Sequence, residues 1–200
     1  MLLTVLCPFV FAIILHSSNI TASAAILQVP IHQLDEYCPY PPGYDRACEF
    51  QGPGLYRLIN YGFQYAATIN TSAPDAAVVS MPLDNTDWAQ QWGIYYIDSS
   101  ENVTMIYNRA TGAALYAATS KKPVRTMYLP PYDKRAHWTM ARDPFADVEG
   151  GPIVFINRAI SGVLDLSATN ENAGTPVLVY PKHNPAARNQ GWYLQLMRLD

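Results

Sequence analysis

The feature that most constrains the fold is a pattern that occurs three times between Pro53 and Asp200. In each copy a strand-like stretch ends in an asparagine, and the asparagines follow one another in steps of 48 and 49 residues: Asn60, Asn108 and Asn157. A turn, a second strand-like stretch and a long polar segment follow, and each copy then reaches a tryptophan: Trp92, Trp138 and Trp192. A unit of this size cannot bury its own apolar face, so the copies must pack on one another.

The local pattern within the copies is typical of β-strands. Apolar and polar residues alternate in short runs such as "GLYRLINYG", "NVTMIYN" and "PIVFIN", and no long helical period occurs. Three copies are too few for an ordinary propeller, and an open stack leaves unpaired strand edges. We therefore expect an all-β fold in which three four-strand units close into a small barrel, with the three tryptophans at equivalent buried positions.

A Q-x-W triplet near the end of the copies adds a resemblance to this physical argument. It reads "QQW" at Gln90–Trp92 and "QGW" at Gln190–Trp192, whereas the second copy reads "AHW" with Ala136 in place of the glutamine. The chain from about Pro53 to Asp200 thereby resembles the ricin B-chain type lectin domain. The resemblance implies a β-trefoil of three repeats of about 48 residues, which is a closed barrel with a hairpin cap.

The resemblance also implies a sugar site in the third repeat. The family places an aspartate after the first turn, an aromatic about fifteen residues further and an Asn-Gln pair about ten beyond that; the matching residues are Asp165, Tyr180, Asn189 and Gln190. A carboxylate accepts charge-assisted hydrogen bonds from sugar hydroxyls, and an aromatic ring covers the apolar face of a sugar. In this scheme Asn189 bonds a hydroxyl and Gln190 orients the carboxylate. Galactose-type glycans are the partners that the resemblance implies.

The other two repeats are expected to lack a site. We align Asp165 with Tyr65 in the first repeat and with Leu115 in the second, and neither side chain is a carboxylate. The simpler interpretation of the third repeat remains open, because an aspartate after a turn often bonds nearby backbone N–H groups. A tyrosine in a β-protein likewise often serves packing.

The N-terminus predicts export. The run Leu2–Leu15 is apolar and uncharged but shorter than the roughly 20 residues of a membrane span. Small residues at Ala22 and Ala24 form a cleavage pattern, so we expect a signal peptide at residues 1–25, a secreted, extracellular protein and no membrane span after cleavage. An uncleaved anchor is the alternative. Residues 26–52 are expected to form a proline-rich N-terminal arm, and residues 53–200 are expected to form the β-trefoil domain.

The remaining cysteines and the sequons fit an exported chain. Cys38 and Cys48 bracket "CPYPPGYDRAC" and are expected to form a disulfide that pins the arm. Their spacing is unlike that of zinc ligands, so no metal and no cofactor are expected. Asn70 and Asn102 begin N-x-S/T triplets and are candidate glycosylation sites.

Two other function classes compete with sugar binding. Some secreted trefoils inhibit proteases through exposed loops, and the segment from Lys122 to Arg125 in "TSKKPVRTMYLPP" could enter a trypsin-like pocket of a target protease, although a solvated basic loop is the simpler interpretation. An enzyme is not expected, since no nucleophile-elbow, zinc-protease or phosphate-loop motif occurs and His32, His137 and His183 are scattered. Glu171 is the acid nearest to Asp165, and it is expected to be solvated in a polar hairpin. The net charge of −3 gives no strong basic field for nucleic acid.

Overall fold

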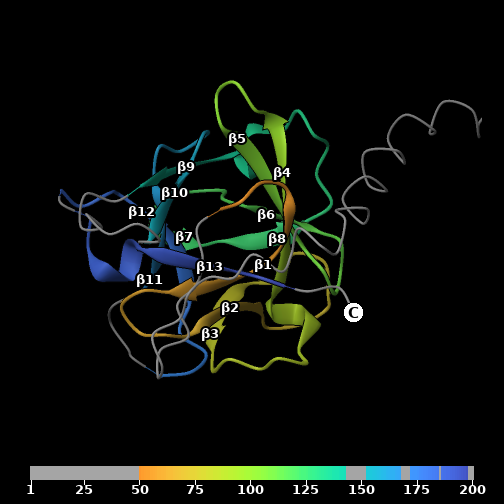
Figure 1. Cartoon of the computed structure of the whole chain (residues 1–200), viewed down its shortest axis with the longest axis vertical. Coiled ribbons are helices and arrows are strands. Elements are labelled where there is room, and N and C mark those ends of the chain that lie inside the picture. Colours follow the sequence, from red (N-terminus) through yellow and green to blue (C-terminus); the bar gives the residue numbers. More distant parts are fainter. Residues whose placement is uncertain (1–49, 143–151, 168–171, 185, 198–200) are drawn as a thin grey trace, which may run out of the picture. The chain divides into compact units, whose positions relative to one another are not determined.

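The computed structural model of the chain describes residues 50–142, 152–167, 172–184 and 186–197 (Figure 1). All of these residues belong to one unit that spans Tyr37–Asp200. The signal peptide, most of the arm, Cys38, Cys48, His32 and Glu171 lie outside the described residues, so the expectations placed on them stay predictions. No helix in the described part is long and apolar enough to cross a membrane.

The described residues form strands and three short 3-10 helices, with no α-helix among them, as the alternating pattern predicts. The first repeat contains β1 (Gly54–Asn60), β2 (Ala66–Ile69), β3 (Val78–Met81), η3 (Trp88–Gln90) and β4 (Gln91–Asp98). The second contains β5 (Val103–Asn108), β6 (Ala114–Tyr116), β7 (Lys122–Pro123), β8 (Arg125–Met127), η4 (Lys134–Ala136) and β9 (Trp138–Arg142). The third contains β10 (Ile153–Asn157), β11 (Val163–Leu166), β12 (Val177–Tyr180), η5 (Arg188–Gln190) and β13 (Trp192–Leu196).

Six of the strands close into a barrel. Antiparallel pairing runs from β1 to β4, β5, β9, β10 and β13, and β13 pairs with β1 again. The closing pair lies side by side in Figure 1 and extends from Tyr56, opposite Leu196, to Asn60, opposite Trp192. Closure leaves none of these six strands with an unpaired edge along the ring, which is the physical advantage that the threefold pattern suggests.

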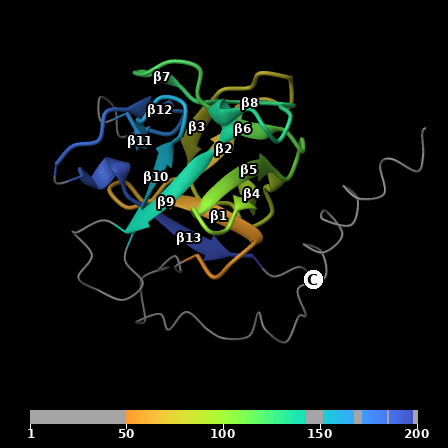
Figure 2. The same ribbon diagram turned by 90° about the horizontal axis from the view of Figure 1, so that it is seen from above.

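The other strands form hairpins at one end of the barrel. β2 pairs with β3, β6 with β8 and β11 with β12, and β7 lies alongside β12 (Figure 2). Backbone hydrogen bonds join the three hairpins, since Val78 N donates to Val124 O at 3.0 Å and Val124 N donates to Val177 O at 2.9 Å. A closed barrel with a hairpin cap is thus the observed architecture, and it is that of a β-trefoil.

The three tryptophans occupy equivalent positions in the core, which confirms the prediction. Trp92, Trp138 and Trp192 are at most 1% exposed. Each indole Nε1 donates to a backbone carbonyl of the first hairpin strand in its own repeat, at 2.9, 3.0 and 2.9 Å; the acceptors are Ala67, Leu115 and Leu164. A buried indole N–H with a partner avoids the cost of an unpaired donor.

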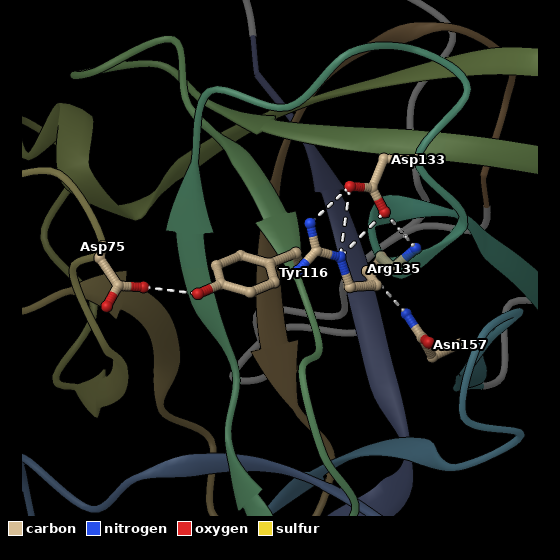
Figure 3. Close-up of polar contacts among 5 residues, drawn as sticks. All are labelled: Asp75, Tyr116, Asp133, Arg135 and Asn157. Atoms are coloured by element: carbon tan, nitrogen blue, oxygen red, sulfur yellow. Dashed lines mark hydrogen bonds and ion pairs between the residues drawn. The ribbon is translucent and has the colours of Figure 1, made fainter.

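The strand-ending asparagines connect successive repeats. Each side-chain oxygen accepts backbone N–H groups of the turn that follows it. Each amide nitrogen donates to the 3-10 helix of the preceding repeat in the ring: Asn108 to Ala89 O, Asn157 to Arg135 O and Asn60 to Asn189 O, at 2.8 to 2.9 Å. Figure 3 shows Asn157 and its hydrogen bond to the backbone of Arg135. This contact explains why the residue recurs and also fixes the helix that carries the candidate site residues.

Candidate functional site

The tryptophan hydrogen bonds establish which residues are equivalent to Asp165. Asp165 follows Leu164, so its counterparts follow Ala67 and Leu115 and are Thr68 and Tyr116. The alignment with Tyr65 and Leu115 is therefore wrong. Tyr65 precedes β2, and the buried side chain of Leu115 belongs to the hydrophobic core. All three true positions lie eight residues after a strand-ending asparagine, and only the third repeat has a carboxylate there.

Two side-chain amides converge on the carboxylate of Asp165. Asn189 Nδ2 donates to Oδ1 at 2.9 Å, and Gln190 Nε2 donates to Oδ2 at 2.8 Å. The side chain is nearly buried, with Asp165 4% exposed. Among the described residues its hydrogen bonds go to these amides and none goes to the backbone of its own turn. A turn-capping role is therefore not what this aspartate performs.

The two amides are themselves held by the backbone. Gln190 Nε2 also donates to Pro181 O at 3.0 Å, and its Oε1 accepts from His183 N at 3.0 Å. Asn189 Nδ2 also donates to Leu166 O at 2.9 Å, which leaves its Oδ1 without a recorded partner among the described residues. Since η5 places both residues next to each other, the carboxylate is fixed from two directions and retains unused lone pairs.

Burial raises the pKa of the Asp165 carboxyl above its usual value of 3.8. A hydrogen bond from Gln190, the electrostatic influence of His183 and a hydrogen bond from Asn189 act in the opposite direction and favour the ionised form. The group is thus a desolvated hydrogen-bond acceptor supported by neutral donors. Such a group is suited to accept hydroxyl protons from a neutral ligand.

Tyr180 lies on the same face of the hairpin as Asp165. In the β11–β12 register Val163 is opposite Tyr180 and Asp165 is opposite Leu178, so the aspartate and the tyrosine are diagonal neighbours. The alternate residues of both strands point into the core: Leu164, Leu166, Val177 and Val179. Tyr180 is half-buried and points away from the barrel interior, as a stacking residue must.

Two further residues adjoin Tyr180. The imidazole of His183 is stacked on its ring, with centroids 5.9 Å apart and planes 13° apart. His183 therefore borders the candidate site. Lys121 Nζ lies 5.6 Å from the ring centroid, and no sequence motif indicated it. The signal that could have found Lys121 is its spacing: it lies three residues before Val124, whose backbone joins the hairpins of the cap.

The equivalent place in the second repeat is filled by other side chains (Figure 3). Tyr116 stands where Asp165 stands, and its hydroxyl donates to Asp75 Oδ1 at 2.6 Å. Arg135 replaces Asn189, forms an ion pair with Asp133 at 2.7 Å and lies over the Tyr116 ring. Burial, followed by the hydrogen bond to Asp75, raises the pKa of Tyr116 to about 12, so this hydroxyl is a persistent donor. The second-repeat position is therefore filled by hydrogen-bonded side chains, with Asp75 supplied by the first repeat, and it offers no free carboxylate.

The first repeat keeps only one member of the third-repeat set. Thr68, Ala89 and Met81 replace Asp165, Asn189 and Tyr180. Gln90 is present and makes the same backbone contacts as Gln190, to Pro82 O at 2.9 Å and from Asp84 N at 3.0 Å. The glutamine of the Q-x-W triplet thus has a structural task in the first repeat that is independent of any carboxylate.

The segment Lys122–Arg125 is not a free loop. Lys122 pairs with Val179 and Pro123 with Leu178, while Arg125 pairs with Tyr116 and forms an ion pair with Asp75 at 2.9 Å. Protease inhibition needs a protruding segment that fits a protease cleft. The observed pairing gives no support to that alternative.

The two candidate glycosylation sites differ in environment. Asn70 is exposed. Asn102 is half-buried and donates from Nδ2 to Met140 O at 3.0 Å, and its sequon threonine, Thr104, is buried with a hydrogen bond to Trp138 O. The folded structure is therefore more compatible with a glycan on Asn70.

Other features of the described residues suggest no additional chemistry. No group of three or more metal-ligating side chains gathers in the described ranges. A cavity of about 260 Å³ lies at the strand ends near Phe50, Tyr96, Met140 and Ile153, away from the third-repeat hairpin. His137 Nε2 lies 2.6 Å from Pro131 O, so it serves a turn.

No protein-family model matches the sequence, and no curated protein matches it either. Solved structures do match. The designed threefold-symmetric protein ThreeFoil shares 17% identity over 72% of this chain and 99% of its own, with a TM-score of 0.63. The Rhizoctonia solani agglutinin shares 18% identity over 76% of this chain and 100% of its own, with a TM-score of 0.59. The Macrolepiota procera ricin B-like lectin in complex with lactose shares 14% identity over 74% of this chain and 99% of its own, with a TM-score of 0.61. Similar structures also include an exo-β-1,3-galactanase and a mosquitocidal holotoxin, of which 31% and 18% are matched.

Proposed function

Because the chain has the ricin B-type lectin fold, we propose that it is a carbohydrate-binding protein with one galactose-type site in the third repeat. The site consists of Asp165, Tyr180, Asn189 and Gln190. The Macrolepiota procera lectin is bound to lactose, which supports a glycan as the partner of this chain. The observation that carries the proposal is the convergence of two amides on a nearly buried carboxylate that the other two repeats lack.

The carboxylate supplies the directional contact. Asp165 accepts hydrogen bonds from neighbouring sugar hydroxyls, and its burial strengthens those bonds because water competes less for them. Gln190 holds the carboxylate from behind through Nε2. Both N–H groups of the Asn189 amide donate hydrogen bonds within the protein. Asn189 therefore contributes its Oδ1, which accepts a hydrogen bond from a further sugar hydroxyl.

Tyr180 supplies the apolar contact. Its half-buried ring is diagonal to Asp165 and covers the C–H face of the sugar. Lys121 lies at the outer limit of cation–π range from this ring, and its long flexible side chain can move aside when a sugar stacks there. A single shallow site of this kind binds weakly, so strong attachment to a surface requires clustered glycans or several copies of the chain.

The remaining parts of the proposal concern export. The expected signal peptide at residues 1–25 makes the protein secreted and extracellular, and Cys38 and Cys48 would bond in that compartment. A glycan on Asn70 fits the same location, since its side chain is exposed. No enzymatic activity is proposed.

A glycan array tests the proposal. The secreted chain and its Asp165→Ala variant would be applied to the same array under identical conditions. We expect the unaltered chain to bind glycans that end in galactose or N-acetylgalactosamine, and the variant to lose that binding while its circular dichroism spectrum stays the same. Binding of no glycan, or equal binding by both proteins, would refute the proposed function.

A further inference from the structure

Lys121 belongs to the second repeat but reaches the candidate site of the third. Its Nζ lies 5.6 Å from the centroid of the Tyr180 ring. Its backbone N donates to Val179 O at 2.7 Å, and the next residue, Lys122, pairs with the same valine. The backbone of Lys121 is therefore fixed on the hairpin that carries Tyr180, and only its flexible side chain is free to adjust.

The same position in each repeat faces the next repeat. Asp75, Lys121 and Gly174 each lie three residues before a cap valine, and each has a left-handed backbone with φ of 62°, 61° and 84°. Asp75 bonds Tyr116 in the second repeat, whereas Gly174 N donates to Ser80 O in the first repeat at 2.6 Å. The residue at this position thus determines which group overhangs the neighbouring repeat. It is a carboxylate over the second repeat, an ammonium over the third and no side chain over the first.

A second lysine, Lys182, is adjacent in sequence to His183, the histidine that is stacked on Tyr180, and it is exposed. Among the described residues Lys121 takes part in no ion pair, and Asp165 lies buried beneath the amides of η5. The whole chain carries a net charge of −3, so the positive charge that Lys121 brings to the Tyr180 ring is opposite to the overall charge. A local charge of this kind favours a ligand of opposite sign beside it.

We propose that Lys121 sets the specificity of the third-repeat site for galactose-type glycans that carry an anionic group, either a sulfate or a carboxylate. The proposal rests on the proposed function, because it assigns a preference to the same site. A sugar held by Asp165 and Tyr180 places its substituents at the edge of the site, near Lys121. There the Lys121 ammonium can leave the Tyr180 ring and form a charge-assisted hydrogen bond with the anionic group.

Titration calorimetry with a set of lactose derivatives tests this preference. The ligands are lactose, lactose with a sulfate on its galactose, and sialyllactose, which carries a carboxylate. The variant is Lys121→Gln, because glutamine accepts the required backbone, as Gln64 does at φ 59°. Lys122→Gln is the matched control, since its side chain is exposed on the adjacent residue.

We expect at least one anionic derivative to bind about tenfold more tightly than lactose, with a preference that weakens as salt is added. Comparing the sulfate with the carboxylate identifies which anionic group is recognised. Lys121→Gln should bring the ratio of affinities close to one, and Lys122→Gln should leave it unchanged. If lactose binds but no derivative binds more tightly, or if the preference survives Lys121→Gln, the inference on Lys121 is wrong while the proposed function stands. If none of these ligands binds, the proposed function fails and the inference fails with it.

Discussion

The second and third repeats share one backbone framework but use the same place differently. In both, a 3-10 helix brings two residues against the start of the hairpin, and a tryptophan N–H fixes the register. In the third repeat the central group is Asp165, whose partners are neutral amides. In the second it is Tyr116, whose partner Asp75 is already supplied by the first repeat. The difference shows that the fold supplies a position, whereas its side chains determine whether a ligand can use it.

The largest effect is expected when the third repeat loses its carboxylate. Asp165→Ala should weaken galactoside binding by about 2 kcal/mol or more, roughly thirtyfold, because it removes a charge-assisted acceptor. Calorimetric titration with lactose measures the change. Tyr116→Phe, at the same position of the second repeat, is the control and should bind as the unaltered chain does. An equal loss in both variants would mean that the two positions do not differ in function.

The aromatic residue should matter almost as much. Tyr180→Ala removes the stacking face and should cost binding a comparable amount, on the order of tenfold or more. Met127 is the equivalent residue of β8, since it pairs with Ala114 as Tyr180 pairs with Val163. Met127→Ala should therefore leave the lactose affinity intact, and a loss of affinity there would contradict the assignment of the site to the third repeat.

Acid should weaken binding in the third repeat without unfolding the protein. Because burial raises the pKa of the Asp165 carboxyl, affinity should be present above that pKa and fall about tenfold per pH unit below it. The loss should begin at a higher pH than for an ordinary carboxyl. A raised pKa in the folded state means that protonation of this group favours folding, so fluorescence of the buried tryptophans should show the fold retained while binding is lost. Affinity that stays constant even well below pH 3.8 would argue against a binding role for the ionised Asp165 carboxylate.

The two glutamines of the Q-x-W triplets separate a structural role from a binding role. Gln90→Ala and Gln190→Ala each leave a backbone carbonyl and a backbone N–H without a partner, so each should lower the free energy of unfolding by about 1–3 kcal/mol. Only Gln190→Ala should also weaken lactose binding, by several-fold, since only Gln190 holds a carboxylate. Urea denaturation gives the stabilities, and titration gives the affinities. A binding loss in Gln90→Ala would show that the effect spreads through the fold.

The smallest effect is expected within the second repeat. Tyr116→Phe removes one hydrogen bond to Asp75 and should lower the free energy of unfolding by about 1 kcal/mol. A cost well above this value would show that Tyr116 does more than close the second-repeat position.

Much of the fold could be predicted from the sequence because its signals are local and repeated. The tryptophans and the strand-ending asparagines mark positions that require one side chain each, an indole for the core and an amide for the turn. The alignment of Asp165 with Tyr65 and Leu115 failed because it was three residues out of register in the first repeat and one residue out of register in the second. Counting from the asparagine to the hairpin identifies Thr68 and Tyr116 instead.

The candidate site was predicted only in part. Asp165, Asn189 and Gln190 form the contacts that their spacing in the third repeat suggests, and Tyr180 shares their face. Lys121 could not be found in the same way, since it comes from the preceding repeat and reaches the site only through the β7–β12 pairing. Contacts between repeats depend on how the hairpins meet in the cap, and no motif within one repeat records that arrangement.

The most direct test of the account is the number of lactose molecules bound by each chain. Titration calorimetry on the unaltered protein, Asp165→Ala and Tyr116→Phe would measure this stoichiometry under identical conditions. We predict one lactose per chain for the unaltered protein and for Tyr116→Phe, and binding weakened about thirtyfold or more for Asp165→Ala. Two or more sites per chain, or one site whose affinity is unchanged in Asp165→Ala, would contradict the claim that the third repeat alone binds sugar.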